Sequence, residues 1–305
     1  MPSTEGFLSR LLLNDEGLRP GWSVLVYLAF WYAALWTLTA FVANFTLPLF
    51  PRLDVGAFSP VNVLLQEFLG FASAYGAALL MARLEQRDVG VYGLPLREAF
   101  GKSFWTGVGL GFAEVTLLVA LIAAFGGYAF GKLALHGPDI FGWGAVWALA
   151  FVFVGFSEEF LFRGYLQFTL GRSTGFWPAA MFLSVLFGAV HLNNPGEGVV
   201  GVASVAVTGL VFAFALRRTG NLWLAVGWHA AFDFGETFLF SVPDSGVLYH
   251  KHLSNAVLHG DAWLTGGTAG PEGSVFSFLT MGISVVVIHL LYPARKKSPV
   301  EPSVP

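Results

Sequence analysis

Long apolar runs, separated by short polar segments, account for most of the chain. Each run approaches or exceeds the roughly 20 residues that a helix needs to cross the hydrocarbon layer of a bilayer. The runs cover residues 22–47, 61–82, 103–125, 143–170, 176–194, 198–216, 222–242 and 274–292. No internal repeat or low-complexity linker divides them. The pattern predicts a single integral membrane domain over residues 1–305, an all-α polytopic bundle of about eight transmembrane helices.

The composition agrees with a chain that lies in lipid. Hydrophobic residues make up 55% of the 305 and charged residues only 11%, which is more apolar than an average soluble domain. The net charge of -3 gives no reason to expect nucleic acid as a partner. Because cysteine is absent, disulfides, thiolate metal sites and cysteine nucleophiles are excluded.

Lysine and arginine are distributed unevenly between the two sets of connecting segments. If the N-terminus lies inside, all of the 16 basic residues except Arg52, Lys132 and Lys251 fall on the inner side or in the apolar runs. The basic run 295–297 contributes to this bias. Because cytoplasmic loops are enriched in lysine and arginine, we expect an integral protein of the cell (plasma) membrane with both termini in the cytoplasm.

Three charged side chains stand together inside the apolar run 143–170. They are Glu158, Glu159 and Arg163. A charge at bilayer depth is costly unless it is paired or faces a polar cavity, so it is a functional hypothesis by default. Glu159 and Arg163 are four residues apart and can pair along one helix face, which favours a structural role. Glu158 is rotated by roughly 100° on the helix and points elsewhere.

Two later runs carry histidine at membrane depth. His191 lies on the run 176–194, with Phe187 one turn before it, and His229 and Asp233 lie four apart on 222–242. Residues four apart share a helix face. If these helices pack against the one with Glu158, the polar groups surround one cavity. From the helix lengths we expect this cavity to open to the cytoplasm and to reach toward the bilayer midplane.

Other polar and small residues within the runs are expected to be structural. Glu67 and Glu114 stand alone on two helices, and such groups usually line a cavity or bond to a neighbouring helix. Gly107 and Gly111 form a small-residue pattern that permits close helix packing.

The polar set is compatible with three kinds of chemistry. A glutamate beside a histidine can activate water as a general base, and groups on a facing helix can stabilise the oxyanion of an attacked amide. Two histidines with carboxylates can also ligate zinc or manganese. The third possibility is a proton or ion relay in a transporter. The spacing of the residues alone does not decide between these three kinds of chemistry.

Three motifs occur in order along successive parts of the chain. They are Glu158-Glu159-x-x-x-Arg163, Phe187-x-x-x-His191 and His229-x-x-x-Asp233. This ordered set resembles the CPBP family, which comprises CAAX prenyl endopeptidases and bacteriocin-processing or immunity membrane proteins, also called Abi proteins. The resemblance covers residues 143–242, which would form the CAAX-protease-like catalytic core.

The resemblance implies an intramembrane endopeptidase that cleaves a CAAX-like or other membrane-associated peptide and needs no metal or other cofactor. Glu158, assisted by His191, would activate the water, and His229 and Asp233 would line the oxyanion site. The residues that would support the site are Glu159, Arg163 and Phe187. The alternatives are a non-catalytic membrane scaffold or bacteriocin-immunity protein, and a metal-dependent form of the protease.

One position departs from the common family pattern. The last motif residue is often asparagine, whose amide can donate to an oxyanion, whereas an ionised Asp233 only accepts hydrogen bonds. Either Asp233 is protonated at depth, or it orients His229 instead.

Overall fold

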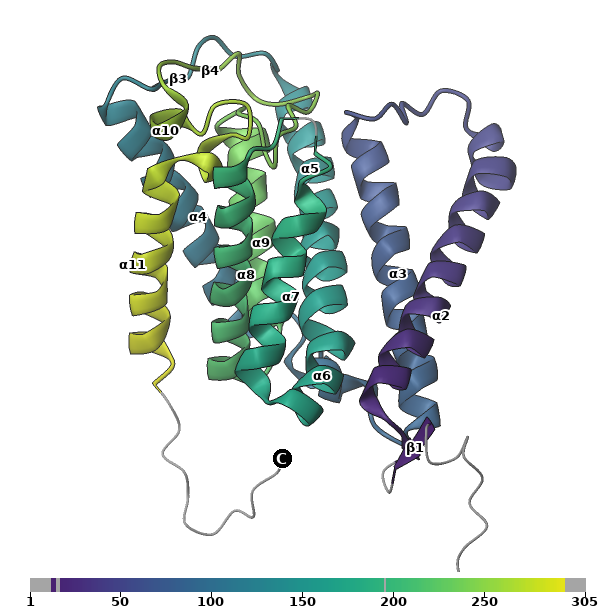
Figure 1. The fold of residues 1–305 in the computed structure, drawn as a ribbon. Helices are drawn as coiled ribbons and strands as arrows, with labels where there is room; N and C mark the ends of the chain where they lie inside the picture. The colour runs from purple at the N-terminus through teal and green to yellow at the C-terminus, as the bar shows by residue number, and fades with distance from the viewer. Residues whose placement is uncertain (1–11, 15–16, 195, 294–305) are drawn as a thin grey trace, which may run out of the picture.

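The computed structural model describes residues 12–14, 17–194 and 196–293, and it shows an almost wholly helical bundle (Figure 1). Its main helices are α2 (Pro20–Phe41), α3 (Pro60–Leu84), α4 (Lys102–Ala124), α5 (Pro138–Glu159), α7 (Phe176–His191), α8 (Val199–Thr219), α9 (Trp223–Phe234) and α11 (Val275–Leu291). Each corresponds to one of the predicted apolar runs. The predicted all-α membrane bundle is therefore confirmed.

The helices differ in how completely they could span a bilayer. Five apolar helical segments of the described chain are long enough to cross it: Pro20–Leu49, Pro60–Leu84, Lys102–Ala124, Pro138–Thr174 and Val199–Thr219. The other three predicted runs form the shorter helices α7, α9 and α11. Helix α7 ends at His191 rather than at residue 194, so this histidine lies at the very end of its helix.

Short elements mark the two ends of the bundle (Figure 1). One end, here called the loop end, carries the paired strands β3 (Tyr128–Ala129) and β4 (Val257–Leu258) and the short helix α10 (Ala262–Thr265). The opposite end, here called the terminal end, carries helix α6 (Leu166–Thr174) and the first strand, β1 (Leu13–Asn14), which pairs with β2 (Gly17–Leu18). The basic run 295–297, which contributes to the predicted orientation, lies outside the described residues.

Three π-helical turns interrupt or extend the helices. Val42–Thr46 extends α2, Phe160–Tyr165 joins α5 to α6, and Gly235–Leu239 extends α9. The middle one contains Gly164, whose backbone is not helical (φ -83°, ψ -114°). Such π turns occur often at functional sites, and this one directly follows the two adjacent glutamates.

A cluster of buried aromatic side chains packs the terminal half of the bundle. Tyr165 stacks on Tyr27 with ring centroids 4.5 Å apart, and Phe156 meets Trp223 edge to face at 5.7 Å. These rings belong to one hydrophobic core that draws on α2, α3, α5 and α9. The bundle is therefore closed by packed side chains between the adjacent glutamates and the terminal end.

Glycine sets the distance between α4 and α9. A Cβ atom at Gly107 would collide with the carbonyl oxygen of Leu224, and one at Gly111 with that of Trp228. Only a residue without a side chain permits this approach, as the small-residue pattern predicted. The contact fixes the position of α9, the helix that carries His229 and Asp233.

We expect Gly111→Ala to destabilise the protein by about 1–3 kcal/mol, the usual cost of forcing extra atoms into a packed interior. Gly109→Ala is the matched control, because a Cβ at Gly109, on the same helix, meets nothing within 4 Å. Thermal unfolding of the two purified variants in the same detergent measures the difference. Equal melting temperatures would show that the α4–α9 contact has room to relax.

Candidate active site

Glu159 and Arg163 form a buried ion pair where α5 passes into its π turn. Arg163 Nη1 donates to Glu159 Oε1 at 3.2 Å, and neither side chain is more than 1% exposed. The guanidinium lies over the ring of Phe187, with Cζ 4.1 Å from the ring centroid. Gly209 on α8 leaves space for it, because a Cβ there would collide with Arg163 Nη2. Three helices thus enclose this arginine.

His229 is held by carboxylates on both sides of its ring. Nδ1 lies 3.0 Å from Glu159 Oε1, and because a carboxylate can only accept a hydrogen bond, Nδ1 carries the donated proton. Nε2 lies 3.6 Å from Glu158 Oε2 and 3.4 Å from Asp233 Oδ2. The two adjacent glutamates therefore meet opposite nitrogens of the same imidazole.

His191 is oriented by the backbone of its own helix. Its Nδ1 lies 2.7 Å from the carbonyl oxygen of Phe187. A carbonyl accepts, so Nδ1–H donates, and in the neutral ring the lone pair is on Nε2. The ring of Phe187 packs edge to face against His191 at 4.8 Å. Phe187 therefore contacts both Arg163 and His191 and links the two sides of the site.

The four residues predicted to be catalytic line a common cavity of about 270 Å³. They are Glu158, His191, His229 and Asp233. The two predicted supporting charges, Glu159 and Arg163, are not among the lining residues and lie behind His229. The adjacent glutamates thus divide into one that reaches the cavity, Glu158 with 27% of its side chain exposed, and one that is sealed, Glu159 with 0%.

The isolated glutamates on other helices have the surroundings expected of structural groups. Glu67 on α3 lines the same cavity opposite Glu158. Glu114 on α4 accepts hydrogen bonds from Ser284 Oγ at 2.9 Å and Thr280 Oγ1 at 3.4 Å, both on α11. The expectation that these groups line a cavity or bond to a neighbouring helix is therefore confirmed.

Loop residues that the sequence did not single out complete the cavity. Asn194 follows the end of α7, and Asp244, Ser245 and Tyr249 belong to the segment after α9. The Asn194 side-chain amide donates to the Ser245 carbonyl at 2.9 Å, which joins the two loops. The signal in the sequence that could have pointed to them is the polar character of residues 243–273, which are rich in Gly, Ser, Asp and His.

The position of the cavity conflicts with the combination of two expectations, that both termini are cytoplasmic and that the cavity opens to the cytoplasm. Besides His229, its lining includes Asn194, Asp244, Ser245 and Tyr249, which belong to the loops at the loop end. If both termini are cytoplasmic, the loop end faces outward, so the two expectations cannot both hold. The reason is the aromatic core described above, which packs between α3, α5 and α9 on the terminal side of Glu158 and which helix lengths alone do not reveal.

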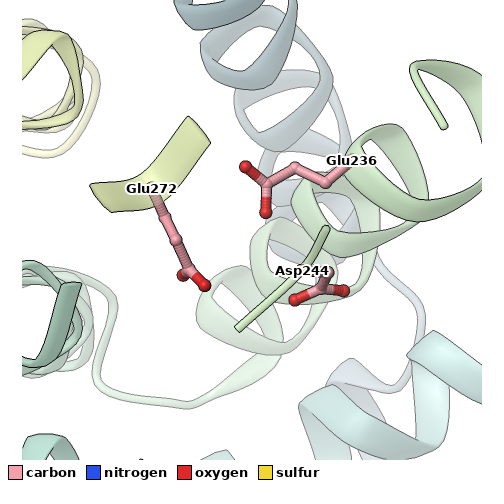
Figure 2. Close-up of side chains that lie close together, drawn as sticks. All are labelled: Glu236, Asp244 and Glu272. Atoms are coloured by element: carbon pink, nitrogen blue, oxygen red, sulfur yellow. The ribbon is translucent and has the colours of Figure 1, made fainter. Parts of the chain in front are cut away.

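A second acidic group lies beside the cavity, at the loop end (Figure 2). The carboxylates of Glu236, Asp244 and Glu272 come within 4.8 Å of one another, close enough to hold a metal ion. Burial, together with nearby negative charges, raises the pKa of Asp244 to about 7 and that of Glu272 to about 8. The metal site considered from the sequence would use the two histidines and nearby carboxylates of the motifs. None of these three acidic residues belongs to those motifs.

Residues 140–235 match the sequence model of the family described as type II CAAX prenyl endopeptidase Rce1-like. This segment belongs to the Rce1-like family. It includes all three motifs and the four cavity residues named above, and it confirms the predicted CAAX protease family. The protein is therefore an intramembrane endopeptidase of the CAAX type. The comparisons with curated proteins and with solved structures gave no match.

We expect Arg163→Met to destabilise the protein by about 3–5 kcal/mol, because removing one partner leaves the other charge buried and unpaired. Arg97→Met is the control: this arginine is 85% exposed and its ion pair with Glu98 lies at the surface, where such pairs contribute about 0–1 kcal/mol. Thermal unfolding compares the two. A loss at Arg163 no larger than at Arg97 would mean that Glu159 is satisfied without its arginine.

Proposed function

We propose that the protein hydrolyses a peptide bond of a membrane-associated substrate with a water molecule activated by Glu158. The observation that carries this proposal is that the two adjacent glutamates have different surroundings. Glu158 alone of the pair lines the cavity, while Glu159 is sealed behind His229. A general base has to reach the proton that it removes, and a partly exposed carboxylate at a polar cavity meets that requirement.

The two histidines take different parts in this proposal. His191 has its Nδ1 proton bonded to a backbone carbonyl, so Nε2 is available to accept a proton or to hold the water. His229 has Nδ1 anchored to Glu159, and a proton on Nε2 would be directed toward the cavity, where it can donate to an oxyanion. The 3.4 Å separation between Asp233 and His229 supports the alternative in which Asp233 orients this ring.

The cavity walls suit a substrate that is partly embedded in lipid. The polar groups come from α3, α5, α7, α9 and the loops, while Val63, Phe151, Val154 and Val190 provide an apolar side. Such a mixed wall can receive a scissile peptide beside an apolar chain. We propose a CAAX-like peptide, or another peptide anchored in the membrane, as the substrate.

The distribution of basic residues supports a plasma-membrane orientation with both termini cytoplasmic. In that orientation the loop end, and with it the cavity, faces the outer side of the membrane. A substrate would then enter from the outer leaflet or from outside.

We expect Glu158→Gln to reduce cleavage by a factor of roughly 10² to 10⁴, the usual contribution of a general base, because the amide cannot take up a proton from water. Cleavage of a fluorogenic farnesylated peptide ending in Cys-aliphatic-aliphatic-Xaa by purified protein measures the loss. Asp139→Asn is the control: it also replaces a carboxylate of α5 by an amide, but at an exposed position in the first turn of that helix and outside the cavity.

The melting temperature of each variant separates a loss of catalysis from a loss of folding. Cleavage retained by a folded Glu158→Gln protein would overturn the mechanism. If wild-type protein cleaves none of a panel of prenylated and unprenylated membrane peptides, the scaffold alternative is favoured.

The absence of cysteine allows a direct test of the orientation. We expect Asp261→Cys, at the loop end, to react with a membrane-impermeant maleimide in intact cells, since this residue is exposed. Arg97→Cys, exposed in the connection between α3 and α4 at the terminal end, should react only after the cells are permeabilised. The reverse pattern would place the cavity on the cytoplasmic side.

A further inference from the structure

We propose that Glu236, Asp244 and Glu272 form a binding site for a calcium ion. The three carboxylates come from separate segments: the π turn after α9, the loop that follows it, and the short 3₁₀ helix Pro271–Gly273. Their oxygens lie within 4.8 Å of one another, and the carboxylates turn toward a shared space (Figure 2). The site is distinct from the motif residues and from the proposed catalytic water.

The hydrogen bonds of the cluster leave most of its acceptor capacity unused. Thr237 Oγ1 donates to Asp244 Oδ2 at 2.9 Å, and the backbone N–H of Ser245 donates to Glu272 Oε1. Glu236 is 0% exposed, and no side chain in the described part of the chain donates a hydrogen bond to either of its carboxylate oxygens. Buried polar groups are nearly always satisfied, so an unpaired glutamate directed at two other carboxylates indicates a missing positive partner.

No ion pair in the described part of the chain reaches the cluster. The ion pairs found there involve Glu85, Glu98, Glu158, Glu159 and Asp233. Three ionised carboxylates at this separation would repel one another strongly in a buried site. A bound cation would both neutralise this repulsion and provide a partner for the carboxylate of Glu236.

The donor set selects the class of cation. All three ligands are carboxylate oxygens, which suit hard cations such as calcium and magnesium rather than metals that prefer nitrogen or sulfur. Calcium accepts oxygens at about 2.3–2.6 Å in a flexible coordination sphere, whereas magnesium requires near-ideal octahedral geometry. Carboxylates contributed by three separate segments are better suited to the more tolerant calcium sphere.

The ion would connect the loop end to the active-site helix. Glu236 follows Asp233 by three residues at the end of α9, while Asp244 and Ser245 line the cavity. A cation shared by Glu236, Asp244 and Glu272 therefore fastens the outer wall of the cavity to the helix that carries His229. Its role is to hold this wall in place, and it takes no part in activating water.

The test is the thermal unfolding of full-length purified protein, treated with EGTA, dialysed, and then titrated with calcium chloride. We expect a saturable rise in melting temperature, because an ion that binds only the folded state stabilises it. Glu236→Gln and Asp244→Asn should each abolish the rise. Asp261→Asn is the matched control: it removes one negative charge from an exposed position of the same outer segment, and it should keep the full response.

Three results would overturn the proposal. The first is the absence of any calcium-dependent shift in the wild type, together with no calcium in the purified protein by elemental analysis. The second is an unchanged response in Glu236→Gln, which should fold without calcium because it removes a buried charge. The third is a response to zinc or manganese but not to calcium. The readout is binding and not cleavage, so its failure leaves the proposed hydrolysis untouched.

Discussion

One buried carboxylate oxygen connects the helices of the site. Oε1 of Glu159 accepts from Arg163 on the same helix and from His229 on α9. Burying these charges is expensive, and the arrangement is stable only while all partners are present. The contacts of Glu159 therefore restrict how α5 and α9 can rotate about their own axes. Only one orientation of the two helices brings Nδ1 of His229 to Glu159, and the same orientation directs Nε2 toward Glu158.

The space for this constraint comes from residues without side chains. Gly107 and Gly111 bring α4 against α9, and Gly209 on α8 leaves room for the guanidinium of Arg163. The aromatic rings on the terminal side then fix α5 against α9. His229 is therefore positioned by two kinds of contact together: the polar contacts of Glu159 and the close packing of α4 and α8 at glycine.

Much of this organisation follows from local sequence, and the remainder depends on long-range contacts. Hydrophobic runs predicted the helices, and the four-residue spacings predicted which charges share a face. The sequence did not reveal that Glu158 would approach His229 more closely than His191, because helix rotation depends on packing between helices. Nor did it reveal the cavity depth or the contribution of Asp244 and Tyr249, since loop residues reach the site only through tertiary folding.

The pairing of β3 with β4 has a consequence for the biogenesis of the protein. Tyr128 aligns with Leu258, so the loop end is assembled from segments that lie far apart in the chain. The motif residues are all synthesised and inserted before β4 emerges, yet the loop that completes the cavity is fastened only when that later strand arrives. A nascent chain therefore contains the motif residues before it contains the strand that closes the loop end over them.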